Sequence, residues 1–176
     1  MSVKLGKKIM IVGSSGSGKS TLARQLGEML HLPVIHIDKE FWQSGWVKTP
    51  IHEWHGKHNK LVSAPEWIMD GNNASNTMEM RLEKADTVIF LDFNRFVCLR
   101  NALKRRLMYI GKKRPDVPEG CPESFSFELV KYIWQFPVQW RPIVMDKISN
   151  YEHIKVFHII NRRMLKRFID DIALEI

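Results

Sequence analysis

Gly13-Ser14-Ser15-Gly16-Ser17-Gly18-Lys19-Ser20 is the stretch of this sequence that decides its fold. The stretch matches the pattern G-x-x-x-x-G-K-[S/T], in which glycines let the backbone curl so that successive N–H groups point at phosphate oxygens. Four apolar residues, Ile9-Met10-Ile11-Val12, come directly before it, and an amphipathic segment follows at once. A strand, a glycine-rich loop and a helix in this order indicate a phosphate-binding loop rather than a chance run of glycine and serine.

Each residue type in this loop has a predicted role toward a nucleotide. The residues expected to hold the phosphates are Gly13, Ser15, Gly16, Ser17, Gly18, Lys19, Ser20 and Thr21. A helix that begins near Lys19 adds roughly half a positive charge at its N-terminus. The Lys19 ammonium is expected to reach the β- and γ-phosphates, and the Ser20 hydroxyl is expected to ligate Mg²⁺. The sequence therefore predicts ATP, or a similar nucleotide, and Mg²⁺ as cofactors.

Apolar runs bounded by turn residues alternate with segments of helical period along the chain. Strands are predicted over residues 8–12, 34–37, 66–69, 87–91 and 155–160. Helices are predicted over residues 19–30, 49–63, 96–110 and 125–149, the last of them interrupted at Pro137 and Pro142. This alternation predicts an α/β fold of the P-loop NTPase type, a three-layer sandwich with a five-stranded parallel sheet between two layers of helices. We expect residues 1–176 to form a single domain.

Three aspartates directly follow predicted strands, namely Asp38, Asp70 and Asp92. The carboxyl ends of parallel strands meet at one edge of the sheet, where ligands bind, so these carboxylates are expected beside the phosphate loop. Asp70 is the candidate for holding Mg²⁺, directly or through water. Asp38 is the candidate catalytic group that accepts or orients the hydroxyl of an acceptor. The alternative is that each aspartate only caps the helix that follows its strand.

The net charge of +8 is concentrated in one segment. Residues 93–115 contain neither Asp nor Glu, and their basic residues are Arg95, Arg100, Lys104, Arg105, Arg106, Lys112, Lys113 and Arg114. An apolar stripe at helical spacing predicts a helix through the same segment, with Phe96, Leu99, Leu103, Leu107 and Ile110. A local concentration of basic residues indicates an anionic partner at one place on the surface.

We expect this segment to form a lid, inserted over about residues 94–122. Phosphoryl transfer requires neutralisation of charge and exclusion of water, and a mobile cover that carries arginines supplies both. Arg106 and Arg114 are the candidate catalytic arginines. A solvated helix face is the alternative role for more than half of these charges.

The sequence resembles known families of nucleotide-binding proteins. The phosphate loop, the pair Asp70-Gly71 and the arginine-rich insertion resemble the adenylate kinase and shikimate kinase group of small P-loop kinases. A second resemblance, over nearly the whole chain, is to proteins labelled DNA topology modulation protein, which are related to adenylate kinases. The motifs that carry it are His36-Ile37-Asp38, Phe41-Trp42, Gly45-Trp46, 67–72, Arg81-Leu82-Glu83, Arg114-Pro115-Asp116 and Glu119-Gly120-Cys121-Pro122.

The resemblance implies roles for individual residues. Asp70 would help to hold Mg²⁺ through water, Asp38 would bind the acceptor, and Arg162 would flank the adenine of ATP. The sequence departs from the adenylate kinases at Ala74, where they have a phosphate-binding arginine, and from the shikimate kinases at His36, where they have an acid. The identity of the acceptor therefore stays open.

The favoured interpretation is an enzyme that transfers the γ-phosphate of ATP to a small acceptor, with a nucleotide or nucleoside as the preferred candidate. The first alternative is a nucleotide-regulated DNA-binding protein that uses residues 95–114, and the second is a nucleotide-gated switch without transfer chemistry. No apolar run approaches the ~20 residues of a membrane span, so no membrane partner is expected. Because the apolar part of the N-terminus is also too short for a secretion signal and the two cysteines give no disulfide framework, a cytoplasmic location is predicted. His52, His55 and His58 are interpreted as a solvated helix face.

Overall fold

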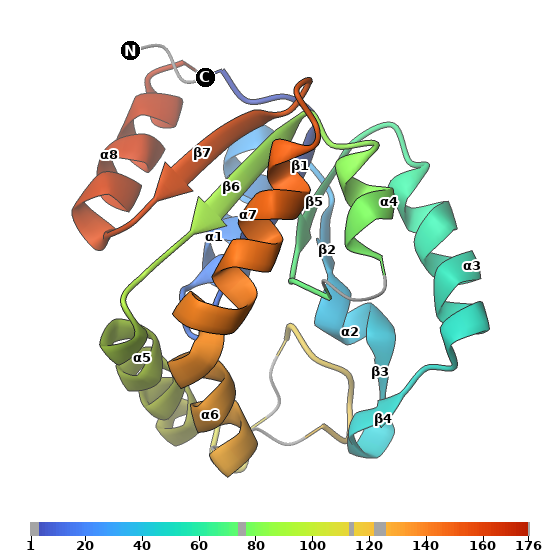
Figure 1. The fold of residues 1–176 in the computed structure, drawn as a ribbon, viewed down its shortest axis with the longest axis vertical. Helices are drawn as coiled ribbons and strands as arrows, with labels where there is room; N and C mark the ends of the chain where they lie inside the picture. The colour runs from blue at the N-terminus through green and yellow to red at the C-terminus, as the bar shows by residue number, and fades with distance from the viewer. Residues whose placement is uncertain (1–3, 74–76, 113–114, 122–125, 176) are drawn as a thin grey trace.

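The sheet confirms the predicted fold class. The computed structural model describes residues 4–73, 77–112, 115–121 and 126–175, and over these residues it contains a parallel sheet of five strands in the order β2-β5-β1-β6-β7. The strands are β1 (Lys8–Gly13), β2 (Val34–His36), β5 (Trp67–Asp70), β6 (Thr87–Leu91) and β7 (Lys155–Ile159). The phosphate loop leaves β1, the middle strand, so it lies at the centre of the carboxyl edge of the sheet (Figure 1).

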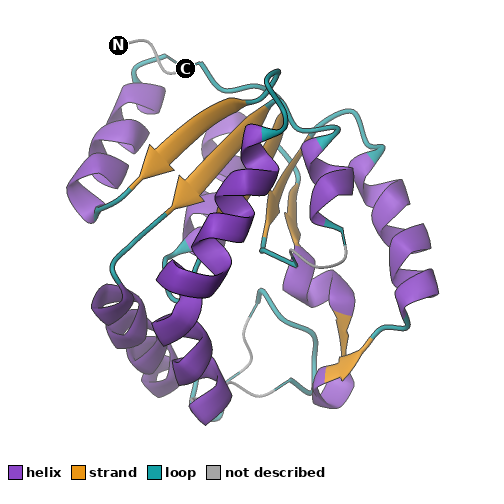
Figure 2. Cartoon of the chain, in the orientation of Figure 1, coloured by secondary structure: helices purple, strands orange, loops and turns teal. Residues whose placement is uncertain are grey.

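Helices cover both faces of the sheet, as Figure 2 shows. Side chains alternate along β1, so Ile9 and Ile11 point to one face and Met10 and Val12 to the other. The first pair packs with residues of α1 (Lys19–Leu30), α5 (Arg95–Met108), α6 (Phe127–Gln135) and α8 (Arg162–Ala173). The second pair packs with residues of α2 (Ile37–Phe41), α3 (Ile51–Val62), α4 (Met78–Leu82) and α7 (Arg141–Ser149).

The predicted elements correspond closely to those of the structure, and the differences are local. The helix predicted over residues 19–30 and the strand predicted over residues 87–91 are confirmed with the same bounds. Four features were not predicted: α2, α4, α8 and the small hairpin of β3 (Trp42–Gln43) and β4 (Val47–Lys48), which flank a 3₁₀ turn at Ser44–Trp46. The two helices α2 and α4 have five residues each, too few for a helical period to be recognised in the sequence.

A continuous helical segment runs from α6 through a π-helical turn into α7. The interruption predicted at Pro137 is confirmed, because Phe136–Trp140 forms a π-helical turn between the two helices. Proline has no N–H to donate and its ring collides with the preceding turn, so a π turn accommodates it. Pro142 lies at the start of α7, where the missing N–H costs nothing.

Helix α5 is rotated so that its apolar stripe is not its buried face. Phe96, Leu103, Leu107 and Ile110 are exposed, whereas Cys98 and Ala102 are buried against the sheet and the phosphate loop. This rotation turns the polar residues Asn101, Lys104 and Arg105 toward the loop. In the part of the chain that the structure describes, no helix has the length and apolar character that a membrane crossing requires.

Candidate active site

The phosphate loop has the backbone that its glycines predict. Gly16 has a φ of 79°, and a Cβ built on it would lie 2.2 Å from the carbonyl oxygen of Cys98 in α5. Only glycine suits both conditions, so α5 packs directly onto the tip of the loop. The Asn101 side chain strengthens this contact, because its Nδ2 donates to the Gly16 carbonyl at 2.8 Å.

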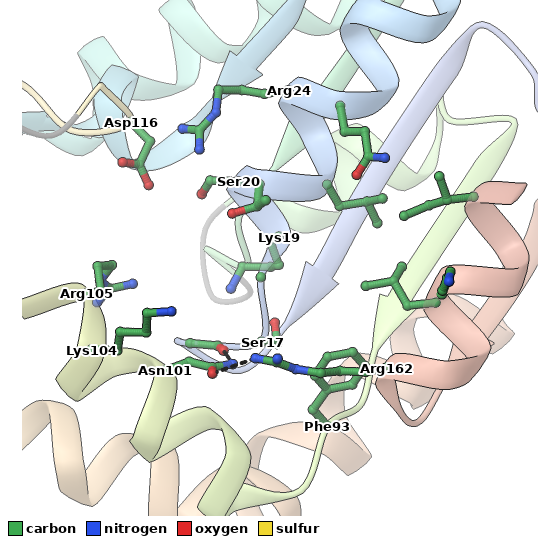
Figure 3. Close-up of a pocket in the computed structure, with 18 of the residues that line it drawn as sticks. Ser17, Lys19, Ser20, Arg24, Phe93, Asn101, Lys104, Arg105, Asp116 and Arg162 are labelled. Carbon is green, nitrogen blue, oxygen red and sulfur yellow. Dashed lines mark hydrogen bonds between the residues drawn. The ribbon is translucent and has the colours of Figure 1, made fainter. Parts of the chain in front are cut away.

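Lys19 points into the space above the loop, as Figure 3 shows. Its Nζ donates to the carbonyl oxygen of Ser14 at 2.9 Å, which folds the side chain back over the loop. Burial lowers the pKa of Lys19, and the negative charges of Asp70 and Asp38 oppose this shift. An ammonium group held among carboxylates in a partly desolvated loop is suited to binding phosphate oxygens.

Asp70 makes the central polar contacts of the site. Its Oδ2 accepts a hydrogen bond from the Ser20 hydroxyl at 2.6 Å, and its Oδ1 contacts Nδ1 of His36. The register of the sheet explains the second contact, since His36 at the end of β2 is the Cα partner of Asp70 at the end of β5. Strand pairing therefore brings together a hydroxyl, a carboxylate and an imidazole from three separate segments.

The residues after Asp70 are held by a buried arginine. Arg81 of α4 is 0% exposed, and its guanidinium donates to the carbonyl oxygens of Gly71, at 2.6 Å, and of Asn72. Burial lowers the pKa of Arg81 to about 10, opposed by the charges of Asp38 and Asp70, so the group remains a cation at neutral pH. Arg81 thus holds the backbone that follows Asp70 and places a buried positive charge near the carboxylates of Asp38 and Asp70.

Asn72 ties this segment to the phosphate loop. Its Oδ1 accepts from the Gly13 N–H at 3.0 Å, and its Nδ2 donates to the Gly13 carbonyl at 2.8 Å. The same Nδ2 donates to the Tyr132 hydroxyl of α6 at 2.7 Å. One amide side chain therefore connects the segment after β5 to the end of β1 and to α6. These hydrogen bonds hold Gly13, the first residue of the phosphate loop, in place.

A cavity of about 730 Å³ opens beside the loop. Its walls come from the loop, from α1, α5 and α8, and from Asp116. Figure 3 shows Lys104 and Arg105 on one side of Lys19, and Arg162 with Asn101 on another. Arg162 donates to Oδ1 of Asn101 at 2.9 Å. A cavity with basic groups around the phosphate loop and apolar side chains along α8 has the composition of a nucleotide site.

Some of the predicted site residues line the cavity and others lie outside it. Lys19, Ser20, Thr21 and Arg162 line the cavity together with the tip of the loop, Gly16, Ser17 and Gly18. Asp38 lies exposed on α2, and its negative charge opposes the lowering of the pKa of Lys19 and Arg81 that burial causes. In α5, Arg105 rather than Arg106 lines the cavity. The prediction for Arg114, like the departure noted at Ala74, lies outside the described residues.

Asp92 makes structural contacts, although these are ion pairs and not the helix cap named as the alternative. Its Oδ2 pairs with Nε of Arg141 at 2.9 Å and with Nε2 of His158 at 2.8 Å. These contacts join α7 and β7 to the end of β6. The interpretation of all three neighbouring histidines of α3 as solvated is wrong for His58, which is 0% exposed and packs against Trp54.

Sequence reasoning missed four residues of the site: His36 as a partner of Asp70, and Asn72, Arg81 and Asn101 as residues that hold the loops. His36 and Asn72 flank predicted strand ends, so their positions at the sheet edge were available as a signal. For Arg81 and Asn101 no local pattern exists, because their partners are 10 and 85 residues away along the chain.

Ser20 and Asp70 fit an Mg²⁺ ion. Both present oxygen, the ligand type that Mg²⁺ prefers. The Oγ of Ser20 and the Oδ2 of Asp70 lie 2.6 Å apart. Among the described residues there is no group of three or more His, Cys, Asp or Glu that could hold a metal ion. Mg²⁺ at nucleotide sites is usually bound by one or two protein groups together with substrate phosphates.

A family model described as ABC transporter matches residues 1–106. The chain belongs to this family of P-loop NTPases. The matched residues of this P-loop NTPase contain the phosphate loop, Asp38 and Asp70, and they end inside α5. No curated protein sequence matches the chain.

Solved structures share the fold of this P-loop NTPase at low sequence identity. Shikimate kinase from Acinetobacter baumannii, in complex with shikimate, is 16% identical with a TM-score of 0.57, over 96% of this chain and 93% of that one. A gluconokinase from Sinorhizobium meliloti 1021 is 12% identical with a TM-score of 0.52, over 98% and 95% of the two chains. Shikimate kinase from Bacteroides thetaiotaomicron is 15% identical with a TM-score of 0.50, over 96% and 98%. These similarities show the fold.

Proposed function

We propose that the protein is an ATP-dependent phosphotransferase that moves the γ-phosphate of ATP to the hydroxyl or phosphate oxygen of a small molecule. The observation that carries the proposal is the hydrogen bond between Ser20 and Asp70, whose negative charge acts on Lys19. It joins a phosphate-binding loop to a carboxylate suited to Mg²⁺, at the sheet edge that also presents Asp38. The fold shared with proteins named shikimate kinase and gluconokinase supports this class of reaction.

Each candidate residue has a role in this proposal. The loop and Lys19 bind the β- and γ-phosphates, and Ser20 and Asp70 hold Mg²⁺, which neutralises phosphate charge when bound. Asp38 orients the attacking oxygen of the acceptor. Arg162, positioned by Asn101, lies at the edge of the cavity where the nucleoside of ATP would extend.

We also propose that residues of about 94–122 act as the lid of a single domain spanning residues 1–176. Lys104 and Arg105 already line the cavity, so this segment brings positive charge to the phosphates. Arg106 and Arg114 remain predicted catalytic arginines of the same lid. A closed lid would exclude water, which competes with the acceptor for the γ-phosphate.

The preferred acceptor is a nucleotide or nucleoside. The motifs shared with adenylate kinase-related proteins support this choice, as does the group of aromatic residues next to Asp38. Phe41 contacts Trp42 at 5.0 Å between ring centroids, and Trp42 contacts Trp46 at 5.7 Å. Half-buried indole rings provide faces on which a base can stack.

The direct test is a coupled assay of ADP release with Mg²⁺-ATP and a panel of acceptors. The panel comprises nucleoside monophosphates, nucleosides, shikimate, gluconate and other small hydroxy acids. One acceptor, or one chemical group of acceptors, should stimulate ADP release above the rate with ATP alone. Failure of every member of a broad panel to do so would contradict a phosphotransferase.

The variant Lys19→Met tests whether any turnover belongs to this site. Removing the ammonium should lower the rate constant by at least about 10²-fold, the usual loss of one group that stabilises developing charge. Lys84→Met is the matched control, because Lys84 is exposed and precedes β6 at the opposite edge of the sheet. Its rate should equal that of the unaltered protein in the same assay.

A nucleotide-regulated DNA-binding protein of the DNA topology modulation type is the second candidate. The concentration of charge in residues 93–115 favours it. The cavity-facing positions of Lys104 and Arg105 favour the nucleotide as the anion that this charge meets. A fluorescence anisotropy titration with duplex DNA separates the two functions. Displacement of weakly held DNA by Mg²⁺-ATP would assign these basic residues to the nucleotide, whereas salt-sensitive binding unaffected by ATP would support the second candidate.

A further inference from the structure

His36 occupies the end of β2, where its imidazole meets the carboxylate of Asp70. The His36 side chain is 11% exposed and that of Asp70 is 5% exposed, so the contact is shielded from water. An ionised carboxylate offers acceptors only, and therefore the Nδ1–H of His36 donates to Oδ1 of Asp70. Oδ2 of the same carboxylate accepts from Ser20 at 2.6 Å. Both oxygens of the Asp70 carboxylate therefore accept hydrogen bonds, one from His36 and the other from Ser20.

We propose that His36 is the positioning residue of the Mg²⁺ site, holding Asp70 in the orientation in which its second oxygen meets Ser20. A carboxylate on a strand end rotates about its terminal bond unless a donor fixes it. The donor here is supplied by strand register, because β2 and β5 place the Cα atoms of His36 and Asp70 opposite each other. Partners that orient a ligand in this way are worth about 10–100-fold in metal affinity or activity when removed.

Among the described residues, the hydrogen-bond partners of the Asp70 carboxylate are Ser20 and His36. Since Ser20 is itself the group that Asp70 must meet, the orienting role falls to His36. Arg81 supports the neighbouring backbone carbonyls rather than the Asp70 side chain. Lys19 donates to the carbonyl of Ser14. Loss of the imidazole would therefore leave Oδ1 without its donor while the loop and its ammonium keep their contacts.

The test measures metal binding rather than turnover. The probe is Mn²⁺, observed by electron paramagnetic resonance in the presence of a non-hydrolysable ATP analogue. In His36→Leu, Mn²⁺ affinity should fall about 10–100-fold, whereas affinity for the analogue in EDTA should stay as in the unaltered protein. In His36→Asn, the amide N–H replaces the Nδ1 donor at nearly the same position and should restore most of the Mn²⁺ affinity.

The matched control is His158→Leu. His158 also lies at a strand end and contacts an aspartate, Asp92, through one ring nitrogen at 2.8 Å. Removing it should leave Mn²⁺ affinity unchanged. Four results would overturn the role of His36: full Mn²⁺ affinity in His36→Leu, an equal loss of analogue binding without metal, an equal loss in His36→Asn, or an equal loss in His158→Leu.

This inference rests on the part of the proposed function that concerns Mg²⁺-nucleotide binding. If the unaltered protein binds Mn²⁺ with the analogue but no acceptor stimulates turnover, the phosphotransferase fails and the comparison of His36 variants still decides the positioning role. If the unaltered protein binds no Mn²⁺ with the analogue, both proposals are contradicted.

Discussion

Two buried polar side chains, Arg81 and His58, lie close to the candidate site. Arg81 and His58 are both 0% exposed, and they lie on facing surfaces of α4 and α3. Within the described part of the chain, the Nε of Arg81 has no hydrogen-bond partner, and the His58 ring packs against Trp54. Burial of such groups favours the neutral form of an imidazole, because a second positive charge beside a guanidinium is costly in a desolvated interior.

The buried imidazole predicts how stability depends on pH. Burial, together with the charges of Arg81 and His55, lowers the pKa of His58 from 6.5 to about 3. Between these values the unfolded chain binds a proton that the folded protein does not. The stability that depends on neutral His58 is therefore fully present above pH 6.5 and is lost as the pH falls. At pH 5 the free energy of unfolding should be lower by about 2 kcal/mol. Urea unfolding at pH 7, 6 and 5 measures it.

The variant His58→Leu should reduce this loss of stability on acidification, since leucine binds no proton. The matched control is His52→Leu in the same helix, because the His52 side chain is 79% exposed. The control should retain the pH dependence of the unaltered protein. An unchanged pH dependence in His58→Leu would show that other groups cause the acid sensitivity.

At the scale of elements, the site depends on how α5 meets the phosphate loop. The apolar stripe of α5 would predict that Phe96, Leu103 and Leu107 face the core, yet the helix buries Cys98 and Ala102. Small side chains on the buried face allow the helix backbone to approach Gly16 closely. The close approach brings Asn101, Lys104 and Arg105 into the site, so packing and function share one contact.

A pair of glycine substitutions tests this contact. Gly16→Ala places a methyl group 2.2 Å from the Cys98 carbonyl at a φ of 79°, and it should destabilise the protein by at least about 1 kcal/mol and weaken ATP binding. Gly56→Ala is the control, because Gly56 lies within α3 with no atom within 4 Å of the added methyl group. That change should stabilise the protein by about 0.5–1 kcal/mol. Thermal unfolding and isothermal titration calorimetry measure both effects, and equal behaviour of the two variants would contradict the close contact.

At the scale of the whole molecule, contacts of high sequence separation converge on the carboxyl edge of the sheet. Asn72 joins β5 to the phosphate loop and to α6, Asp92 joins β6 to α7 and β7, and Arg162 joins α8 to α5. Helices on both faces of the sheet are therefore tied to its carboxyl edge, α6 through Asn72 and α7 through Asp92. A ligand that occupies the cavity contacts the phosphate loop, α1, α5 and α8, and it should therefore stabilise the folded chain.

The expected size of this effect follows from mass action. Mg²⁺ with a non-hydrolysable ATP analogue at about 100 times its dissociation constant should add about 2.7 kcal/mol to the free energy of unfolding. For a chain of this length, that corresponds to a rise of about 5–10 °C in Tm. Differential scanning fluorimetry measures it, with Lys19→Met as the variant that should lose most of the shift. An equal shift in both proteins would place the nucleotide elsewhere.

Sequence by itself determined the features that depend on neighbours along the chain. The spacing of Gly13, Gly18 and Lys19 specifies the phosphate loop, because its backbone shape and its helix N-terminus are local properties. The alternation of apolar strands with helices specifies the parallel sheet, and with it the edge where Asp38 and Asp70 emerge. The choice of phosphate acceptor was not determined at this level.

Only the tertiary structure decided which side chains meet. The contact of His36 with Asp70 depends on the register of β2 against β5, and the presence of Arg105 rather than Arg106 in the cavity depends on the rotation of α5. Arg81 reaches Gly71 only because α4 packs against one face of the sheet beside the end of β5. Strand register and helix rotation minimise the free energy of packing over distant segments, so no pattern within a short stretch of sequence specifies them.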